Sequence, residues 1–511
     1  MFVLLLNNYF DAFDFPNIPS YICPMLTQFN DRQTLSALLL AAYFIFILWL
    51  VFRSQKDENS TDYFLAGRKM PFWALSITFI ASWWGGGSAV DLIDQAFNNG
   101  ISSFWIYGMP VLFSTFLMFL FAKGIRKIGT ISQPQLMEAR YNAASAQLLS
   151  ILILIFMVIG SAVQVIVIGR FFSTFFAISY EMAAILGTLI VVAYSVFGGF
   201  KGVVITDILQ FVFLLIAAIT LFIYAYNGAG GFSGLSQIVE QKELPNFFDF
   251  THNLSANMAY IITFGAAWMI QANIWQRISA TRTPVDAKKM MVMSFLAFLP
   301  LYLLVTLTGM LSRGLYETVP EGGIAAAMIF DHMPTVLSAV IFVGICSAIM
   351  STMDSLINTG ALVLTIDLYQ SKNKTVSDEK MVKVGRLATL LVALVSLFIG
   401  VNINSILTVS WIGSDFLATG AFVPLVMGFI WKRGTATGAM ASMIFGVLFS
   451  SFNLLAAFDI GISVPWKIAS TSQAMTGMLA SFVIYIVVSL LTKPSTKGVN
   501  FIEKAGMLKK V

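Results

Sequence analysis

A stripe of polar side chains interrupts the apolar stretch between residues 342 and 369. Its members follow the spacing i, i+4, i+7 and i+8, which places them on one face of a helix: Ser347, Ser351, Asp354 and Ser355. A carboxylate inside a membrane helix costs roughly 2.5–3.5 kcal/mol and usually marks an ion or proton pathway. Because hydroxyl and carboxylate oxygens are hard ligands, the stripe predicts a site for a small hard cation. The alternative is that the hydroxyls only bond to their own helix or join two helices.

The composition places this stretch in a membrane. The chain has 511 residues, of which 58% are hydrophobic and 11% are charged, whereas soluble domains carry roughly 25% charged residues. The sequence therefore predicts an all-α polytopic membrane protein. Cys23 and Cys346 are far apart and Cys346 lies in the predicted helix, so a disulfide framework is not indicated. His252 and His332 fall in predicted loops, and no Cys/His cluster offers a transition-metal site.

Hydropathy divides the chain into thirteen predicted membrane segments. They are 33–53, 72–97, 102–122, 146–169, 179–199, 203–226, 255–276, 290–312, 334–370, 387–404, 406–431, 436–459 and 470–492. An odd number of spans places the two termini on opposite sides of the membrane. The first residues contain no Lys or Arg, so they lack the positive region of a signal peptide and are interpreted as an extra-cytoplasmic tail.

The positive charges of the loops predict the orientation. If the N-terminus is outside, the cytoplasmic side receives 25 of the 30 Lys and Arg residues and the outside receives 5. Those five are Arg32, Arg170, Lys242, Arg313 and Lys467. Cytoplasmic loops are rich in Lys and Arg, so this split predicts an extra-cytoplasmic N-terminus and a cytoplasmic C-terminus in the cell (inner or plasma) membrane. The net charge of +5 needs no nucleic-acid partner to explain it.

Two of the predicted spans look broken. The segment from Ala81 to Ser88 contains three consecutive glycines in mid-membrane, and each costs up to ~1 kcal/mol in a helix interior. Unwound backbone at that depth is tolerated only where it lines a cavity, and its carbonyls can then coordinate a cation. The alternative is a tight helix crossing through small residues. The segment 255–276 has Gln271 and Asn273 in a polar middle, but it is less plainly interrupted.

The broken spans are five apart, which indicates two five-helix units of the kind found in inverted-repeat transporters. The predicted parts are a tail, an accessory helix with its loop, a first core repeat, an outer loop, a second core repeat, and two accessory helices with a short tail. Their ranges are 1–32, 33–71, 72–226, 227–254, 255–433 and 434–511. Asp207 is a second carboxylate in a membrane segment, and an ordinary solvated carboxylate at a helix start is the alternative.

Five motifs in order along the chain resemble the sodium:solute symporter family. They are Asp62–Arg68, Tyr194–Gly199 with Thr206, Asp207 and Gln210, Trp275–Arg277 with Ser279 and Ala280, Ser351–Ser355 with Asp367–Tyr369, and Trp431–Arg433 with Gly438 and Ala439. Each motif is modest alone, but together they are specific. The resemblance implies a leucine-transporter-type fold of the APC superfamily kind, Na+ as the coupling ion and no organic cofactor.

The resemblance also implies which residues bind the ion. The shared sodium site of the family corresponds here to three backbone carbonyls and two hydroxyls, those of Ala81, Trp84, Ala348, Ser351 and Thr352. Some members hold a second sodium ion, and the matching positions are Asp207, Ser351, Asp354 and Ser355. Asp354 replaces a serine of the two-sodium members, so it could strengthen that site or take up a proton.

The closest local matches resemble the choline-transporter branch among bacterial members, through Trp83–Gly87 and through Ser414–Asp415 followed by Pro424–Leu425. Choline carriers hold the ammonium in an aromatic cage, because ring faces attract cations. Trp83 matches one wall, but Gln271 replaces another, which favours a carboxylate, an amide or a hydroxyl as the solute group. The candidate substrate residues are Trp83, Ser88, Tyr107, Gln164, Trp268 and Gln271.

The sequence therefore predicts a sodium-coupled secondary active symporter. It would import a small organic solute by alternating access, with Na+ between core helices 1 and 8, and would work as a monomer surrounded by lipid. A sodium- or proton-coupled carrier of choline or another quaternary amine is the alternative. A channel, a transporter-like solute sensor and an enzyme are rivals from other classes. They would be expected to show pore-lining repeats, a signalling domain or a catalytic constellation, and none of these is evident.

Overall fold

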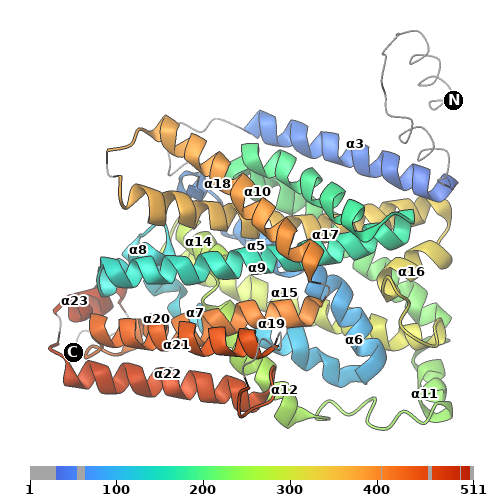
Figure 1. Ribbon diagram of the computed structural model, residues 1–511. Helices are drawn as coiled ribbons and strands as arrows, with labels where there is room; N and C mark the ends of the chain where they lie inside the picture. Colours follow the sequence, from blue (N-terminus) through green and yellow to red (C-terminus); the bar gives the residue numbers. More distant parts are fainter. Residues whose placement is uncertain are drawn as a thin grey trace.

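The protein is an all-helical bundle in this computed structural model, which describes residues 30–54, 64–373, 375–403, 405–457, 463–494 and 496–506. Within these ranges there is no strand, and eleven helices are long and apolar enough to cross a membrane. Figure 1 shows the long helices running side by side, with the start of α3 (Asp31–Ser54) and the helix α23 (Thr496–Ala505) at opposite ends. Most of the predicted tail, 1–32, lies outside the described residues.

The long helices follow the predicted hydrophobic segments. They include α7 (Phe104–Ile128), α9 (Ala143–Phe176), α10 (Tyr180–Gly228), α15 (Pro284–Leu311), α17 (Thr335–Leu362), α18 (Asp378–Asn402), α21 (Ala436–Ala457) and α22 (Thr471–Leu491). Helix α17 continues as η6 (Val363–Gln370), and α19 (Ile406–Leu417) continues through η7 (Ala418–Phe422) into α20 (Val423–Ile430). The short helices α8 (Gln133–Arg140), α11 (Gly231–Gln241) and α16 (Ile324–Asp331) lie in the connections.

The first of the two irregular spans is broken, as predicted. Helix α5 (Phe72–Trp83) ends where Trp84 leaves the helical conformation, and the chain resumes as η2 (Gly87–Asp91) and α6 (Leu92–Asn99). Each glycine lowers helix stability by up to ~1 kcal/mol relative to Ala, which favours an interruption here. The expectation of an interrupted span at residues 81–88 is therefore confirmed.

The second irregular span is also broken, more clearly than its sequence indicates. It runs as α12 (Leu254–Tyr260), η4 (Ile261–Gly265), α13 (Ala266–Met269) and, after a turn at Ile270 and Gln271, α14 (Ala272–Ala280). Side chains satisfy the carbonyls that the break frees: Trp275 Nε1 donates to Met269 O at 2.8 Å, and Gln133 Nε2 donates to Ile270 O at 2.9 Å. The two broken spans explain why thirteen segments become eleven long helices.

A single glycine separates two membrane spans within α10. Gly199 has φ of 55° and ψ of −172°, a conformation open to glycine and strained for residues with a Cβ. The spans on either side are 180–197 and 199–228, which match the separate segments 179–199 and 203–226 that hydropathy predicts. The glycine therefore makes the sharp turn between them.

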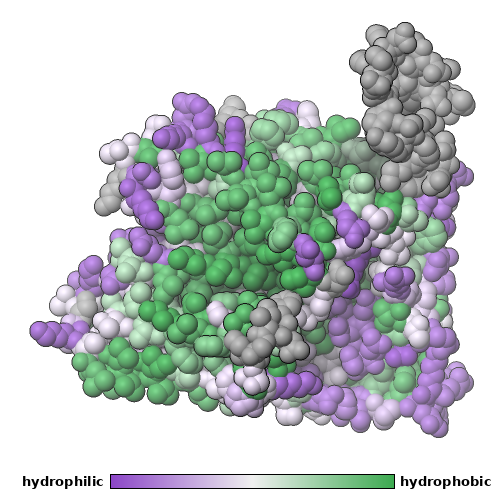
Figure 2. Space-filling model, viewed as in Figure 1, coloured by the Kyte–Doolittle hydropathy of each residue, from purple (hydrophilic) through white to green (hydrophobic). Residues whose placement is uncertain are grey.

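Helix α17 forms the centre of the bundle. Every residue from Ile341 to Val363 is buried, so the polar stripe of this helix faces protein and not lipid. It packs against α5, α9, α10, α14 and α18. Figure 2 shows an apolar belt across the middle of the visible face and polar residues toward its two ends, as a membrane protein requires.

Candidate functional site

The break between α5 and η2 lies against the middle of α17. Thr352 Oγ1 on α17 donates to Ala81 O in the last turn of α5, at 3.3 Å. The last carbonyls of a helix have no partner four residues further on, so the break leaves oxygens free to bind an ion. A broken backbone and a hydroxyl-bearing helix thus meet in the protein interior.

The glycines of the break allow this close approach. A Cβ built on Gly85 would lie 2.3 Å from Thr352 Oγ1, and one on Gly86 would lie 2.5 Å from Val167 Cγ2. A Cβ built on Gly87 would lie 3.0 Å from the ring of Tyr107. Larger residues would force α5 and η2 away from their neighbours, so Gly85 to Gly87 serve the contact as well as the break.

The residues predicted for the first sodium site all lie in this region. Ala81, Trp84, Ala348, Ser351 and Thr352 are buried at the end of α5 and on α17. The Ser351 hydroxyl donates its proton to Asp207 Oδ1, which leaves the oxygen lone pairs available to a cation. Of the five oxygens that the resemblance implies, Thr352 Oγ1 and Ala81 O are in direct contact.

Asp207 belongs to a buried ion pair that sequence reasoning missed. Its carboxylate accepts from the hydroxyls of Thr78 and Ser351, and it lies 3.3 Å from Arg277 Nη2. Both charged side chains are at most 1% exposed. The sequence placed Arg277 among the cytoplasmic loop charges and left open a solvated Asp207. Both interpretations are wrong, because each ion is buried and has the other as its counter-ion.

The guanidinium of Arg277 also connects several helices. From α14, Nη2 donates to Ser355 Oγ on α17 at 2.8 Å and to Thr78 Oγ1 on α5 at 3.0 Å, and it also donates to Ser82 Oγ. Nη1 donates to Asn273 O at 2.9 Å. Only the tertiary structure brings this arginine to the carboxylate, although its Trp-Gln-Arg motif drew attention to it.

The four residues predicted for a second cation separate into two groups. Ser351 and Ser355 face Asp207 and Arg277, whereas Asp354 Oδ1 accepts from Ser195 Oγ on the first span of α10 at 2.5 Å. The first hydroxyl of the stripe, Ser347, donates to Val343 O of its own helix at 2.8 Å, as the alternative interpretation expected. The stripe is thus wide enough to face two neighbours.

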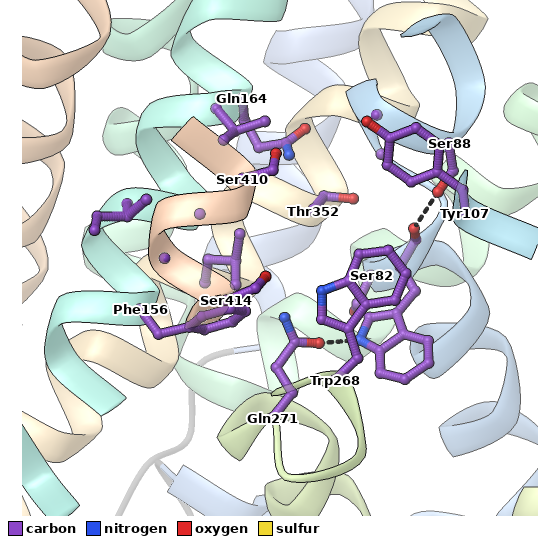
Figure 3. A pocket seen from close by; sticks show the side chains of 18 of the residues that line it. Ser82, Ser88, Tyr107, Phe156, Gln164, Trp268, Gln271, Thr352, Ser410 and Ser414 are labelled. Atoms are coloured by element: carbon purple, nitrogen blue, oxygen red, sulfur yellow. Dashed lines mark hydrogen bonds between the residues drawn. The ribbon is translucent and has the colours of Figure 1, made fainter. Parts of the chain in front are cut away.

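A cavity of about 90 Å³ opens beside the break. All six predicted substrate residues line it: Trp83, Ser88, Tyr107, Gln164, Trp268 and Gln271. Thr352 lines it as well, so the cavity and the proposed ion site share a side chain. Figure 3 shows these residues together with Ser410 and Ser414 of α19, which were not among the predicted substrate residues.

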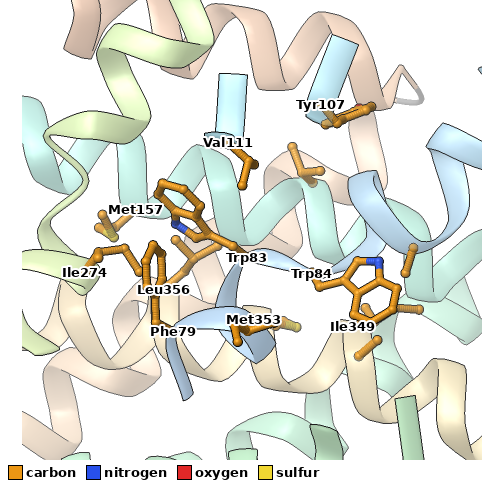
Figure 4. Close-up of a cluster of buried hydrophobic side chains, with 14 of the residues drawn as sticks. Phe79, Trp83, Trp84, Tyr107, Val111, Met157, Ile274, Ile349, Met353 and Leu356 are labelled. Carbon is orange, nitrogen blue, oxygen red and sulfur yellow. The ribbon is translucent and has the colours of Figure 1, made fainter. Parts of the chain in front are cut away.

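Aromatic rings form the apolar wall of the cavity. The ring centroids of Trp83 and Trp268 are 5.9 Å apart, and those of Tyr107 and Trp268 are 6.2 Å apart. Figure 4 shows Trp83 and Trp84 turned to different sides of the break, Trp83 toward Phe79 and Trp84 toward Ile349. The two neighbouring tryptophan side chains thus pack against different parts of the protein.

The helical arrangement with two broken spans is a leucine-transporter-type fold. A structure of a Na+-coupled sialic acid symporter matches with a TM-score of 0.77 at 18% identity, covering 91% of this chain and 99% of that one. MhsT in complex with L-phenylalanine matches with a TM-score of 0.51 at 13% identity, covering 82% of this chain and 97% of that one. These likenesses establish the fold alone.

The sequence comparison gives the family. The model described as "Sodium:solute symporter family" matches residues 63–446, so the chain belongs to this family of transporters. Its relatives include the osmoregulated proline transporter OpuE of Bacillus subtilis, 26% identical over 90% of this chain and 95% of the relative. The sodium/glucose cotransporter of Vibrio parahaemolyticus is also 26% identical, over 79% of this chain and 81% of the relative. The family predicted from the five motifs is therefore confirmed.

Proposed function

We propose that this protein is a Na+-coupled symporter that imports a small organic solute by alternating access. Na+ binds between the break after α5 and the middle of α17, at Ala81, Trp84, Ala348, Ser351 and Thr352. The observation that carries the proposal is the position of Thr352, which contacts Ala81 O and also lines the cavity. An ion at this contact would order the wall of the solute site, which couples the two binding events.

The ion would favour the state that binds solute. Na+ bridges α5 and α17 while the cavity is open to the outside, and closure around the solute precedes opening to the inside. A membrane potential adds ~2.3 kcal/mol per charge per 100 mV to the driving force. Separation of α5 from α17 on the inner side then splits the ion site and releases Na+. The orientation remains that predicted from the loops, with the N-terminus extra-cytoplasmic.

One Na+ per solute is the coupling ratio that we propose. The second predicted set, Asp207, Ser351, Asp354 and Ser355, already has a positive charge beside it, because Arg277 lies against Asp207 and Ser355. A second cation there would face the guanidinium, and the Asp354 carboxylate already accepts from Ser195 on α10. Like charges at short range disfavour such an occupant.

The test is Na+ binding by the purified full-length protein. Replacing Ser351 and Thr352 together by Ala removes both hydroxyl ligands, so the Na+ concentration for half-maximal thermal stabilisation should rise at least about tenfold, equivalent to 1.4 kcal/mol. Ser338→Ala is the matched control, because this buried hydroxyl on the same helix has no hydrogen-bond partner. An unchanged Na+ midpoint in the double variant would contradict the proposed site.

A further inference from the structure

Two buried glutamines hold their side-chain amides in fixed orientations at the cavity. Gln164 Oε1 accepts from Gly86 N at 2.9 Å, and Gln271 Oε1 accepts from Trp83 Nε1. A backbone N–H and an indole N–H can only donate. The carbonyl oxygen of each amide must therefore face its protein partner, and the NH2 group must face the other way.

Both NH2 groups lack a hydrogen-bond partner among the described residues. Gln164 is 6% exposed and Gln271 is 7% exposed, and both line the cavity. Figure 3 shows the nitrogen of each amide turned into the cavity, from opposite ends of the view. Gln33, Gln133 and Gln276 differ, because each donates its NH2 to a backbone carbonyl. Both NH2 groups are therefore available to donate to a hydrogen-bond acceptor in the cavity.

Among the described residues, no Asp, Glu, Lys, Arg or His side chain lines this cavity. Three acids close in sequence to lining residues each accept a hydrogen bond from another side chain, and for Asp354 the donor is Ser195. Asp91 Oδ2 accepts from Tyr107 Oη at 2.9 Å, and Asp415 Oδ2 accepts from Asn453 and Gln473 at 3.2 Å each. A solute ammonium would therefore meet donors and no carboxylate, and burying an unpaired charge is costly.

We infer that the solute is a small carboxylate with an uncharged body. This inference rests on the proposed function, because the Na+ ligands are neutral carbonyls and hydroxyls and the ion brings a positive charge to the cavity wall. The carboxylate accepts from Gln164 Nε2 beside the break, close to that charge. The uncharged body lies against Trp83 and Trp268, and Gln271 Nε2 donates to an oxygen of the body.

Matched probe pairs test the inference on the purified full-length protein. Potassium propionate is compared with propionamide, and potassium L-lactate with lactamide, each by thermal shift in NaCl and in KCl, with choline chloride as a cationic probe. In NaCl at least one carboxylate should bind tenfold more tightly than its amide, and choline should give no shift. If no carboxylate outbinds its amide, or if choline binds as tightly, the inference is wrong.

Substitutions test whether the side-chain amides of Gln164 and Gln271 cause the preference for a carboxylate probe over its amide. Gln164→Glu keeps the acceptor for Gly86 N but replaces the free donor by an anion, so the preference for carboxylate should fall at least tenfold. Gln271→Glu makes the same change at the other end and is used if the first variant does not fold. Gln241→Glu at the surface end of α11 is the control and should keep the preference. An unchanged preference in Gln164→Glu or its substitute overturns the assignment.

A measurement with Na+ and no organic probe distinguishes failure of the proposed Na+ site from failure of the proposed carboxylate solute. A thermal shift with NaCl and no probe reports the ion site. If that shift is absent, the Na+ site of the proposed function is contradicted. If the shift is present but no carboxylate outbinds its amide, only the solute assignment is contradicted.

Discussion

Two polar regions lie side by side in the core, and they differ in how many of their polar groups have hydrogen-bond or ion-pair partners within the protein. Among the described residues, the cavity proposed for the solute has no Asp, Glu, Lys, Arg or His in its lining and holds two amide donors without a protein acceptor. The neighbouring region holds the ion pair of Asp207 and Arg277, surrounded by hydroxyls that all bond to it. Ser82 joins them, because it lines the cavity and accepts from Arg277.

The difference indicates two roles for buried polar groups in one protein. A region that is saturated by its own partners fixes helices relative to one another, and here Arg277 links α14 to α5, α10 and α17. A region that is left incomplete is completed by a ligand. Burial and polarity alone would not distinguish them, since Gln164 and Asp207 are both buried.

The largest effect is expected from Arg277→Met. This change leaves the Asp207 carboxylate buried without a counter-ion, which should cost about 3–5 kcal/mol of stability. Thermal or chemical unfolding in detergent measures the loss. The double variant Arg277→Met with Asp207→Asn should recover part of it, because neither residue then carries a charge. A double variant no more stable than the single one would show that the pair does not act as a unit.

Gly85→Ala should affect the incomplete region next most strongly. Its new Cβ would lie 2.3 Å from Thr352 Oγ1 and would push the break away from α17, so the Na+ midpoint should rise about tenfold, or 1.4 kcal/mol. Gly202→Ala is the control, because the nearest side-chain atom there is 3.7 Å away. Equal Na+ midpoints for the two variants would argue against an ion at the break.

Asp354→Ser tests the carboxylate of α17 that accepts from Ser195 on α10. If Asp354 takes up a proton or a cation during transport, its loss should lower the charge moved per solute by up to one, with little change in stability because a hydroxyl can still bond to Ser195. Reversal potentials measured in proteoliposomes give this ratio, with Asp286→Asn at the exposed start of α15 as the control. An identical ratio would remove Asp354 from ion coupling.

The smallest effect is expected from Lys242→Ala, which breaks an exposed ion pair. Lys242 Nζ lies 2.6 Å from Glu317, and the lysine holds the pKa of this carboxyl below its ordinary value of 4.5. The contribution is therefore present above pH 4.5 and is lost as the pH falls through the lower folded value. Solvent screens such pairs, so the melting temperatures of variant and wild type should almost coincide at pH 7 and converge fully once the pH lies below the lowered pKa of Glu317. A large loss at pH 7 would weaken the contrast with Arg277.

The sequence alone determined the class of protein, the spans and the first break. These follow from local properties: apolar runs of membrane length, loop charges, and glycines that a helix interior does not favour. The family followed from five ordered motifs. The second break was harder to predict, because it has no run of glycines and is stabilised by Gln133, which is distant in sequence from Ile270.

Only the tertiary structure decided which polar groups meet. Helical spacing put Ser351, Asp354 and Ser355 on one stripe, but a stripe of that width faces two neighbouring helices, and spacing does not tell which residue faces which. The pairing of Arg277 with Asp207 joins residues 70 positions apart, and the orientation of Gln164 depends on a backbone N–H of another helix. Such contacts depend on how distant segments pack, which no local pattern of residues encodes.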